Sequence, residues 1–146
     1  MNIFSAINKG TKILRDSSIL TADLYSEILM AKAINKDRKY ILMNSNENID
    51  QYSFNKFEKL IEARSKRKPI AYLTNKKFFW NTEFYVNENT LIPRPDTELI
   101  IENVLNLTKN KNQLSILDIG IGSGCILLSI LKEKKNFYGT GIDISK

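Results

Sequence analysis

Apolar residues recur every three or four positions through the first part of the chain, as they do on the buried face of a helix. The pattern predicts three helices, which begin near residues 3, 21 and 50, and the third runs to about residue 66. Asn35-Lys36-Asp37 breaks the second, and a polar loop at 44–48 follows a short apolar stretch. We expect one small helical unit over residues 1–68. The positions that carry the pattern are Ile3, Phe4, Ile7, Ile13, Leu14, Leu20, Leu24, Ile28, Leu29, Ala33, Phe54, Phe57, Leu60 and Ile61.

The pattern changes at Pro69 to one typical of strands. Phe78-Phe79-Trp80 and Glu83–Val86 flank Asn81-Thr82, which predicts a hairpin of two aromatic strands. Two closely spaced prolines in Leu91–Pro95 then exclude a helix or central strand and fix an extended segment. We therefore assign residues 69–97 to a hairpin and a proline-rich linker.

A helix is predicted next, from Glu98 to about Lys109. Asp96 and Thr97 are residue types that cap helices, and Glu98 suits a first turn. Asp96 and Glu98 could also form a carboxylate pair for acid–base chemistry, but capping explains them better.

The last segment reads as strand, glycine-rich turn, helix and strand. Leu114–Ile119 and Asn136–Asp143 are the strands, and the helix runs from Gly124 to about Lys134. This order is typical of a βαβ unit, the start of a parallel sheet. The fold class is therefore α + α/β: a helical bundle, a hairpin linker and a first βαβ unit.

Composition narrows the protein class. The 146 residues are 42% hydrophobic and 26% charged, as in globular domains. No apolar run reaches the roughly 18 residues of a membrane helix, and no signal peptide is recognisable. With one cysteine, Cys125, no internal disulfide can form, which favours a reducing cytoplasm. The absence of histidine excludes histidine-based metal sites and catalytic triads.

The net charge of +6 can be interpreted in two ways. An excess of cations favours an anionic partner, but lysine is frequent throughout, so composition alone can account for it. The basic run Arg64–Lys68 could likewise contact RNA or an acidic protein, or be a solvated helix end. Trp80 and its aromatic neighbours could stack on a base, although a hairpin core is the more frequent role for such residues.

The strongest chemical signal is Asp118-Ile119-Gly120-Ile121-Gly122-Ser123-Gly124. Glycine adopts positive φ and lets backbone approach a ligand, and the free N–H groups of the following helix favour a polar or anionic group. Asp143 ends the next strand, where a carboxylate can bind both hydroxyls of a ribose. The alternative is a tight turn with an ordinary surface aspartate. The spacing matches neither the G-x-G-x-x-G dinucleotide motif nor a P-loop.

This segment resembles the first motif of class I S-adenosylmethionine-dependent methyltransferases. Arg64, Arg67, Pro69 and Tyr72 match an R-x-x-R-x-P-x-x-Y pattern, and Leu91–Glu98 reads L-I-P-R-P-D-T-E. Together these strings are similar to the HemK family, which methylates the glutamine of the Gly-Gly-Gln motif in peptide-chain release factors. The resemblance covers nearly the whole chain.

The resemblance implies a cofactor, a substrate and a set of binding residues. The cofactor would be S-adenosyl-L-methionine, and the partner would be the Gly-Gly-Gln loop of a release factor. Residues 1–68 would recognise that partner, and residues 98–146 would begin a Rossmann-like methyltransferase domain. No membrane or metal is expected, nor direct binding of nucleic acid. Cofactor binding would fall to Gly120, Ile121, Gly122, Ser123, Gly124 and Asp143, with Pro93, Arg94 and Pro95 at its edge.

Three departures from the family pattern stand out. Ile121 replaces a usual threonine, and Asn75 replaces a usual glycine. The family's Asn-Pro-Pro-Tyr motif, which holds the substrate amide, is absent from the 146 residues, so no catalytic residue is assigned. We expect a truncated N-terminal part, inactive alone, which a separate C-terminal half could complete. The alternatives are another class I methyltransferase acting on nucleic acid or ribosomal protein, or a non-catalytic remnant or binding module.

Overall fold

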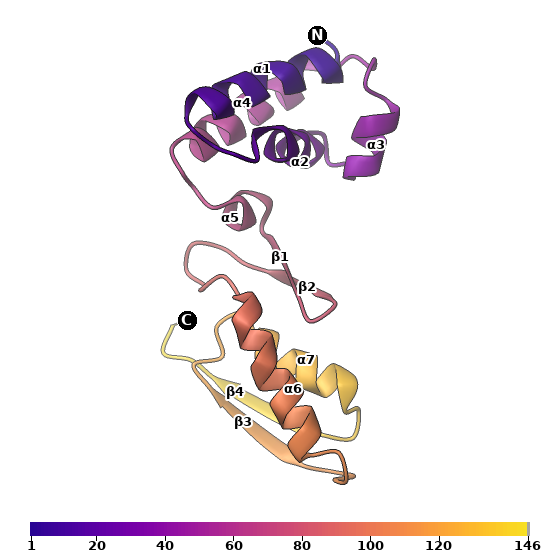
Figure 1. The fold of residues 1–146 in the computed structure, drawn as a ribbon, viewed down its shortest axis with the longest axis vertical. Helices are drawn as coiled ribbons and strands as arrows, with labels where there is room; N and C mark the ends of the chain where they lie inside the picture. Colours follow the sequence, from indigo (N-terminus) through magenta and orange to yellow (C-terminus); the bar gives the residue numbers. More distant parts are fainter. Residues whose placement is uncertain (146) are drawn as a thin grey trace. The chain divides into compact units, whose positions relative to one another are not determined.

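The computed structural model describes residues 1–145 and divides into two compact units (Figure 1). The first is Met1–Thr74, and the second begins at Asn75. The first unit is helical and the second contains two small two-stranded sheets, so the chain combines helices with a minor share of strand. The assignment of separate roles to these segments stays a prediction.

The first unit consists of five helices, four of which pack around the central α2. Helix α2 contacts α1, α3, α4 and α5, and its buried residues face several directions. A helix that is apolar on most sides is stable only when neighbours surround it, which explains this central place. In the described residues of this unit the only strand-like pairing is an isolated bridge between Asn2 and Asn48. The helices are α1 (Ile3–Asp16), α2 (Ala22–Ile34), α3 (Arg38–Met43), α4 (Gln51–Ser65) and α5 (Ile70–Thr74).

Side-chain caps define where three of these helices begin. The side chains of Asn2, Asp37 and Asp50 each accept a hydrogen bond from the backbone N–H three residues later, over 2.9, 2.7 and 2.8 Å. Each satisfies a donor that has no partner inside the helix. Asn35 ends α2 in the left-handed conformation, with φ 54°. The predicted starts at residues 3 and 50 are therefore confirmed to within one residue.

Two short helices were not predicted. The apolar stretch before the 44–48 loop is α3, which Asp37 initiates, and the segment after Pro69 forms α5. Pro69 marks the start of a helix because proline is well tolerated in a first turn. The predicted apolar face of α2 is also partly wrong. Leu20 is fully exposed and Leu24 is 40% exposed, while Ser26 and Met30 are buried.

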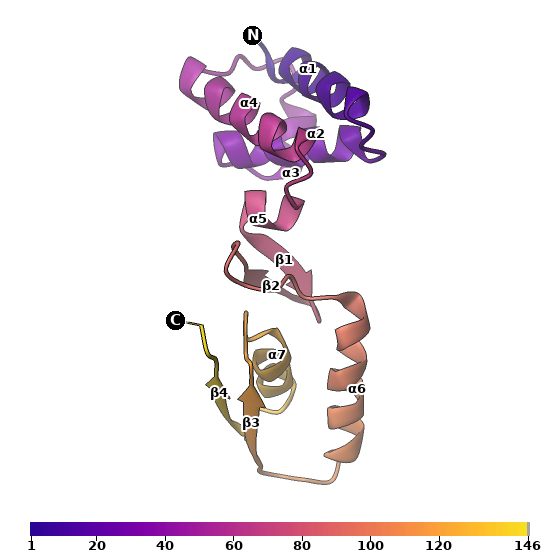
Figure 2. The same ribbon diagram turned by 90° about the vertical axis from the view of Figure 1, so that its left-hand side faces the viewer.

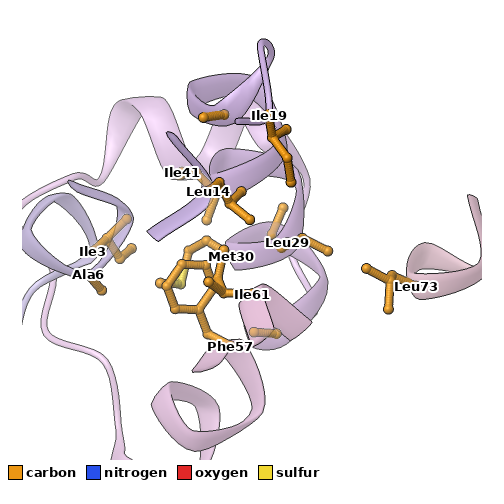
Figure 3. Close-up of a cluster of buried hydrophobic side chains, with 13 residues drawn as sticks. Ile3, Ala6, Leu14, Ile19, Leu29, Met30, Ile41, Phe57, Ile61 and Leu73 are labelled. Atoms are coloured by element: carbon orange, nitrogen blue, oxygen red, sulfur yellow. The ribbon is translucent and has the colours of Figure 1, made fainter. Parts of the chain in front are cut away.

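The core of the first unit lies between α1, α2 and α4. Phe57 and Ile61 of α4 pack against Leu14 of α1 and Leu29 and Met30 of α2 (Figure 3). The buried Ser26 donates its hydroxyl to the carbonyl of Ile7, 2.8 Å away, so this polar group is satisfied.

The basic run at the end of α4, Arg64–Lys68, makes contacts inside the first unit. The Arg64 guanidinium lies 4.7 Å from the centre of the Tyr25 ring and donates to the carbonyl of Lys68. Arg67 donates to the carbonyl of Ser17, and Lys66 pairs with Glu62. These contacts hold the end of α4 against the α1–α2 turn, which favours a structural role for both arginines.

The second unit begins with the predicted hairpin. Strands β1 (Lys76–Phe79) and β2 (Thr82–Tyr85) pair antiparallel, with Phe79 opposite Thr82. The turn is Trp80-Asn81, one residue earlier than predicted, and both residues have positive φ, 45° and 56°. Positive φ at both positions is what a two-residue hairpin turn requires.

Two carboxylates hold this turn in place. The Trp80 backbone N–H donates to Glu98 and its indole N–H donates to Glu133, over 3.0 and 2.9 Å. Glu98 is therefore a partner of the hairpin. The predicted side-chain cap is also wrong, because Thr97 makes no capping hydrogen bond. Phe79 and Phe84 are buried against each other and form the predicted hairpin core, but their neighbours Phe78 and Tyr85 are exposed, so the prediction holds only in part.

A βαβ unit completes the fold. The linker ends in a 3₁₀ turn (η1, Pro95–Thr97), and α6 (Glu98–Leu107) follows. Strands β3 (Ser115–Ile119) and β4 (Tyr138–Ile142) pair in parallel, with α7 (Cys125–Glu133) between them in sequence. Helix α7 contacts both strands and α6 (Figure 2).

One face of this sheet has no cover in the described residues. Ile116 and Asp118 of β3 lie on the same face as Gly139 and Gly141 of β4, and this face packs on α7. The other face is apolar and exposed. Parallel sheets are normally covered on both faces, so an exposed apolar face is unusual for such a sheet. This face carries Leu117, Ile119, Tyr138 and Ile142, which are 58%, 74%, 64% and 49% exposed.

Gly10→Ala should destabilise the first unit. A Cβ at Gly10 would lie 2.6 Å from Phe57 Cζ and 2.7 Å from Ser26 Oγ, so α1 could not pack as closely on α2 and α4. Overpacking costs about 1–3 kcal/mol, and the gain in helix propensity of roughly 1 kcal/mol offsets part of it, so the net loss is up to about 2 kcal/mol. Denaturant unfolding followed by circular dichroism would measure it, with the exposed Lys12→Ala as control. An unchanged midpoint for Gly10→Ala would contradict the close packing.

The uncovered sheet face should bind an apolar dye. We expect strong 8-anilinonaphthalene sulfonate fluorescence and self-association of the 146-residue chain, because large exposed apolar patches drive both. Leu117→Lys with Ile119→Lys should reduce both signals, whereas Leu20→Lys, on the first unit, should not. A monodisperse chain that binds no dye would refute this expectation.

Candidate functional site

The candidate site is the loop between β3 and α7. Gly120, Gly122 and Gly124 all have positive φ, at 80°, 52° and 76°, a conformation that other residues adopt only under strain. A Cβ built on Gly120 would meet no atom within 4 Å, so this backbone borders open space. A ligand can therefore approach the backbone closely at Gly120 and Gly122, whereas a Cβ on Gly124 would meet Leu128 at 3.1 Å.

Backbone hydrogen bonds fix this loop to the end of β4. The N–H groups of Gly120 and Ile121 both donate to the carbonyl of Ile142, over 2.8 and 3.1 Å. Gly124 donates in turn to the carbonyl of Ile121, 2.8 Å away. The loop conformation is therefore set by the neighbouring strand as well as by its own sequence.

Asp143 lies directly against the glycine loop. Its carboxylate accepts the N–H of Ser145 at 2.9 Å and the N–H of Gly122 at 2.8 Å, and these bonds lower its pKa below the ordinary 3.8. Their contribution to stability is present above the unfolded-state pKa and is lost as the pH falls through the lower folded-state value. At neutral pH the group is a fixed, exposed carboxylate with lone pairs left to accept further hydrogen bonds.

An open pocket of about 400 Å³ borders these residues. Gly120 and Asp143 line it together with Ile119, Ile142 and Ile144. The first turn of α7 lies beyond the loop and has no capping side chain, so its N–H groups are available to a ligand. A pocket with an apolar wall and a carboxylate suits a nucleoside, whose hydroxyls can donate to the carboxylate.

The structure brings most of the predicted binding residues together. Gly120, Ile121, Gly122, Ser123, Gly124 and Asp143 form one cluster at the ends of β3 and β4. Pro93 is buried while Arg94 and Pro95 are exposed, and no polar contact among residues 1–145 joins these three to the loop. Ile119, Ile142 and Ile144 line the pocket but were not predicted as site residues. Their position beside the strand ends was the only available signal.

The described residues hold no candidate metal site, and their one cysteine is buried. Cys125 is buried in the first turn of α7, and residues 1–145 hold no cluster of three potential metal ligands. A helix able to span a lipid bilayer does not occur among residues 1–145.

The first unit matches a known domain family. Residues 5–74 match the model of the PrmC N-terminal domain, which ends where the first compact unit ends.

Comparison with curated proteins extends the match over the whole chain. The release factor glutamine methyltransferase of Leptospira interrogans is 39% identical over 146 residues, and that of Clostridium acetobutylicum is 34% identical over 145 residues. Each alignment covers 99% of this chain and 51% of the relative. The bifunctional methyltransferase of Rickettsia typhi is 35% identical over 162 residues, with 99% of this chain and 31% of the relative covered.

The chain therefore spans about half the length of these two release factor glutamine methyltransferases. Residues 5–74 therefore belong to the PrmC N-terminal domain family, and the chain as a whole is similar to the N-terminal portion of release factor glutamine methyltransferases of the HemK family.

Proposed function

We propose that this chain supplies half of the S-adenosylmethionine site of a methyltransferase that modifies the Gly-Gly-Gln glutamine of peptide-chain release factors. The observation that carries the proposal is the hydrogen-bonded pair of the glycine loop and Asp143, at the ends of two parallel strands. The family of the relatives supports the substrate and the use of S-adenosylmethionine. The βαβ unit with α6 is then the start of a Rossmann-like sheet.

The residues present fit this cofactor. The methionine part would lie against the backbone at Gly120 and Gly122, where no side chain stands in the way. The free N–H groups at the start of α7 suit its carboxylate. Asp143 would accept hydrogen bonds from the ribose hydroxyls, with its orientation already set by Gly122 and Ser145. The bound cofactor supplies an electrophilic methyl group on a sulfonium.

The 146 residues contain no group assigned to grip the substrate amide. An amide nitrogen is a weak nucleophile, so catalysis must come from positioning and from hydrogen bonds that polarise the amide. The family's Asn-Pro-Pro-Tyr motif, which does this, does not occur in the sequence. We propose that polypeptide packed on the uncovered face and edges of the β3–β4 sheet supplies it, and that the helical first unit recognises the release factor.

One observation favours nucleic acid as a second substrate class. Four lysines surround an open pocket of about 400 Å³ in the second unit, and no carboxylate in the described residues forms an ion pair with them. Lysines without an ion pair suit phosphate groups. Lys134, however, donates to the carbonyl of Thr108 and lies over the Phe137 ring, and the Glu133 carboxylate lines the same pocket. The four lysines follow α6 and α7, whose carbonyl ends also attract cations, so a structural role competes with phosphate binding. The lysines are Lys109, Lys111, Lys134 and Lys135.

Asp143→Asn should weaken cofactor binding about tenfold or more, because charge-assisted hydrogen bonds to the ribose and to Gly122 are replaced by weaker neutral ones. Calorimetric titration with S-adenosylhomocysteine would measure it at pH 7, where the wild-type carboxylate is ionised. Glu102→Gln, an exposed carboxylate of α6, is the matched control and should bind like wild type. Equal affinities of Asp143→Asn and wild type would remove Asp143 from the proposed site.

Methyl transfer should need more than these 146 residues. Radiolabelled methyl transfer to a release factor should be undetectable with the chain alone and should appear when a C-terminal methyltransferase half with Asn-Pro-Pro-Tyr is added. Activity of the chain alone would contradict the proposal that these 146 residues are inactive without a C-terminal half. No activity with the complement would favour a non-catalytic remnant, and transfer to nucleic acid alone would favour the second substrate class.

A further inference from the structure

We infer that Ile121 is a positioning residue, which packs into the space left by the missing side chain of Gly141 and so holds the glycine loop against Asp143. The inference rests on the proposed function for its link to the cofactor. The contact itself is a property of the fold and can be tested without a ligand.

The space over Gly141 is occupied by one side chain. A Cβ built on Gly141 would lie 1.9 Å from Ile121 Cδ1, 2.9 Å from its Cγ1 and 3.1 Å from its Cβ. The three nearest atoms thus all belong to Ile121, and the first distance is far below any real carbon–carbon contact. No side chain fits at position 141 while Ile121 keeps its place.

The backbone does not require glycine at position 141. Gly141 lies inside β4, opposite Asp118, and its φ is outside the positive region that favours glycine. Glycine in a strand interior lowers stability, so its presence needs a reason such as the close approach of another group. Here that group is Ile121, from the loop after the neighbouring strand.

The same glycine loop carries the contacts to Asp143. Ile121 N donates to the carbonyl of Ile142, and the next residue, Gly122, donates to the Asp143 carboxylate. Ile142 and Asp143 directly follow Gly141 in the chain. Packing of Ile121 on Gly141 therefore fixes the two segments side by side at the point where the loop N–H meets the carboxylate.

Gly139 provides an internal comparison. It lies two residues earlier on the same face of β4, and a Cβ there would meet Leu127 and Leu131 of α7, each at 2.8 Å. Both glycines make room for a neighbour, but Gly139 makes room for helix α7 and not for the loop. A substitution at Gly139 should disturb packing without moving Gly122.

The test uses four variants of the full chain: Gly141→Ala, Ile121→Ala, the double variant, and Gly139→Ala as control. Solvent exchange of the Gly122 amide, measured by NMR, reports the hydrogen bond to Asp143 without any ligand. Titration with S-adenosylhomocysteine reports the proposed site. Gly141→Ala should speed Gly122 exchange about tenfold and weaken binding about tenfold, the loss of roughly one well-formed hydrogen bond.

Removal of the Ile121 side chain should rescue Gly141→Ala. Ile121→Ala alone should speed Gly122 exchange, but by less than Gly141→Ala, because it removes the packing without a clash. In the double variant the nearest remaining atom is Ile121 Cβ at 3.1 Å, which small shifts can accommodate, so both values should return to those of Ile121→Ala alone. Gly139→Ala should lower the melting temperature and leave Gly122 exchange unchanged.

Two results would overturn the inference: a double variant no better than Gly141→Ala, or the same loss of Gly122 protection in Gly139→Ala. A different result separates it from the proposed function. If wild type binds no cofactor while the rescue of Gly122 exchange is observed, the positioning role of Ile121 is supported and the proposed cofactor site is refuted.

Discussion

The carbonyl of Ile142 is the contact on which the candidate site depends. It accepts the N–H groups of Gly120 and Ile121 and so joins the glycine loop to the end of the neighbouring strand. Without that bond the three positive-φ glycines would be free to adopt many conformations, and the Asp143 carboxylate would lose its donor from the loop, the Gly122 N–H. The site is thus a property of two paired strands, and a ligand would meet groups whose orientation is already set, which lowers the entropy lost on binding.

The sequence predicted the long elements well because their signals are local. The spacing of apolar residues predicts the helices that begin at Ile3 and Gln51, and the aromatic pairs around Trp80-Asn81 predict a hairpin. Helix α3 was missed because six residues are too few to show a helical period. The buried face of α2 was partly wrong because that helix is surrounded by others, so apolar positions do not mark one side.

The contacts between distant segments could not be predicted. Glu98 has the composition of a helix start, yet its carboxylate accepts the N–H of Trp80, 18 residues away in the chain. Gly141 looks like an unremarkable strand residue until the loop after β3 is seen to occupy its side-chain space. For the site, residue type and spacing indicated the glycines and Asp143, but only the structure shows that Gly122 and Asp143 are hydrogen-bonded to each other.

The place of Trp80 gives the protein a built-in optical probe. It is the only tryptophan in the chain, and its indole N–H is bonded to Glu133 within the second unit. Intrinsic fluorescence excited at the indole band therefore follows the docking of the hairpin on α6 and α7. Far-ultraviolet circular dichroism is dominated by the helices of the first unit. The two signals together can separate the unfolding of one unit from that of the other in unlabelled, unmodified protein.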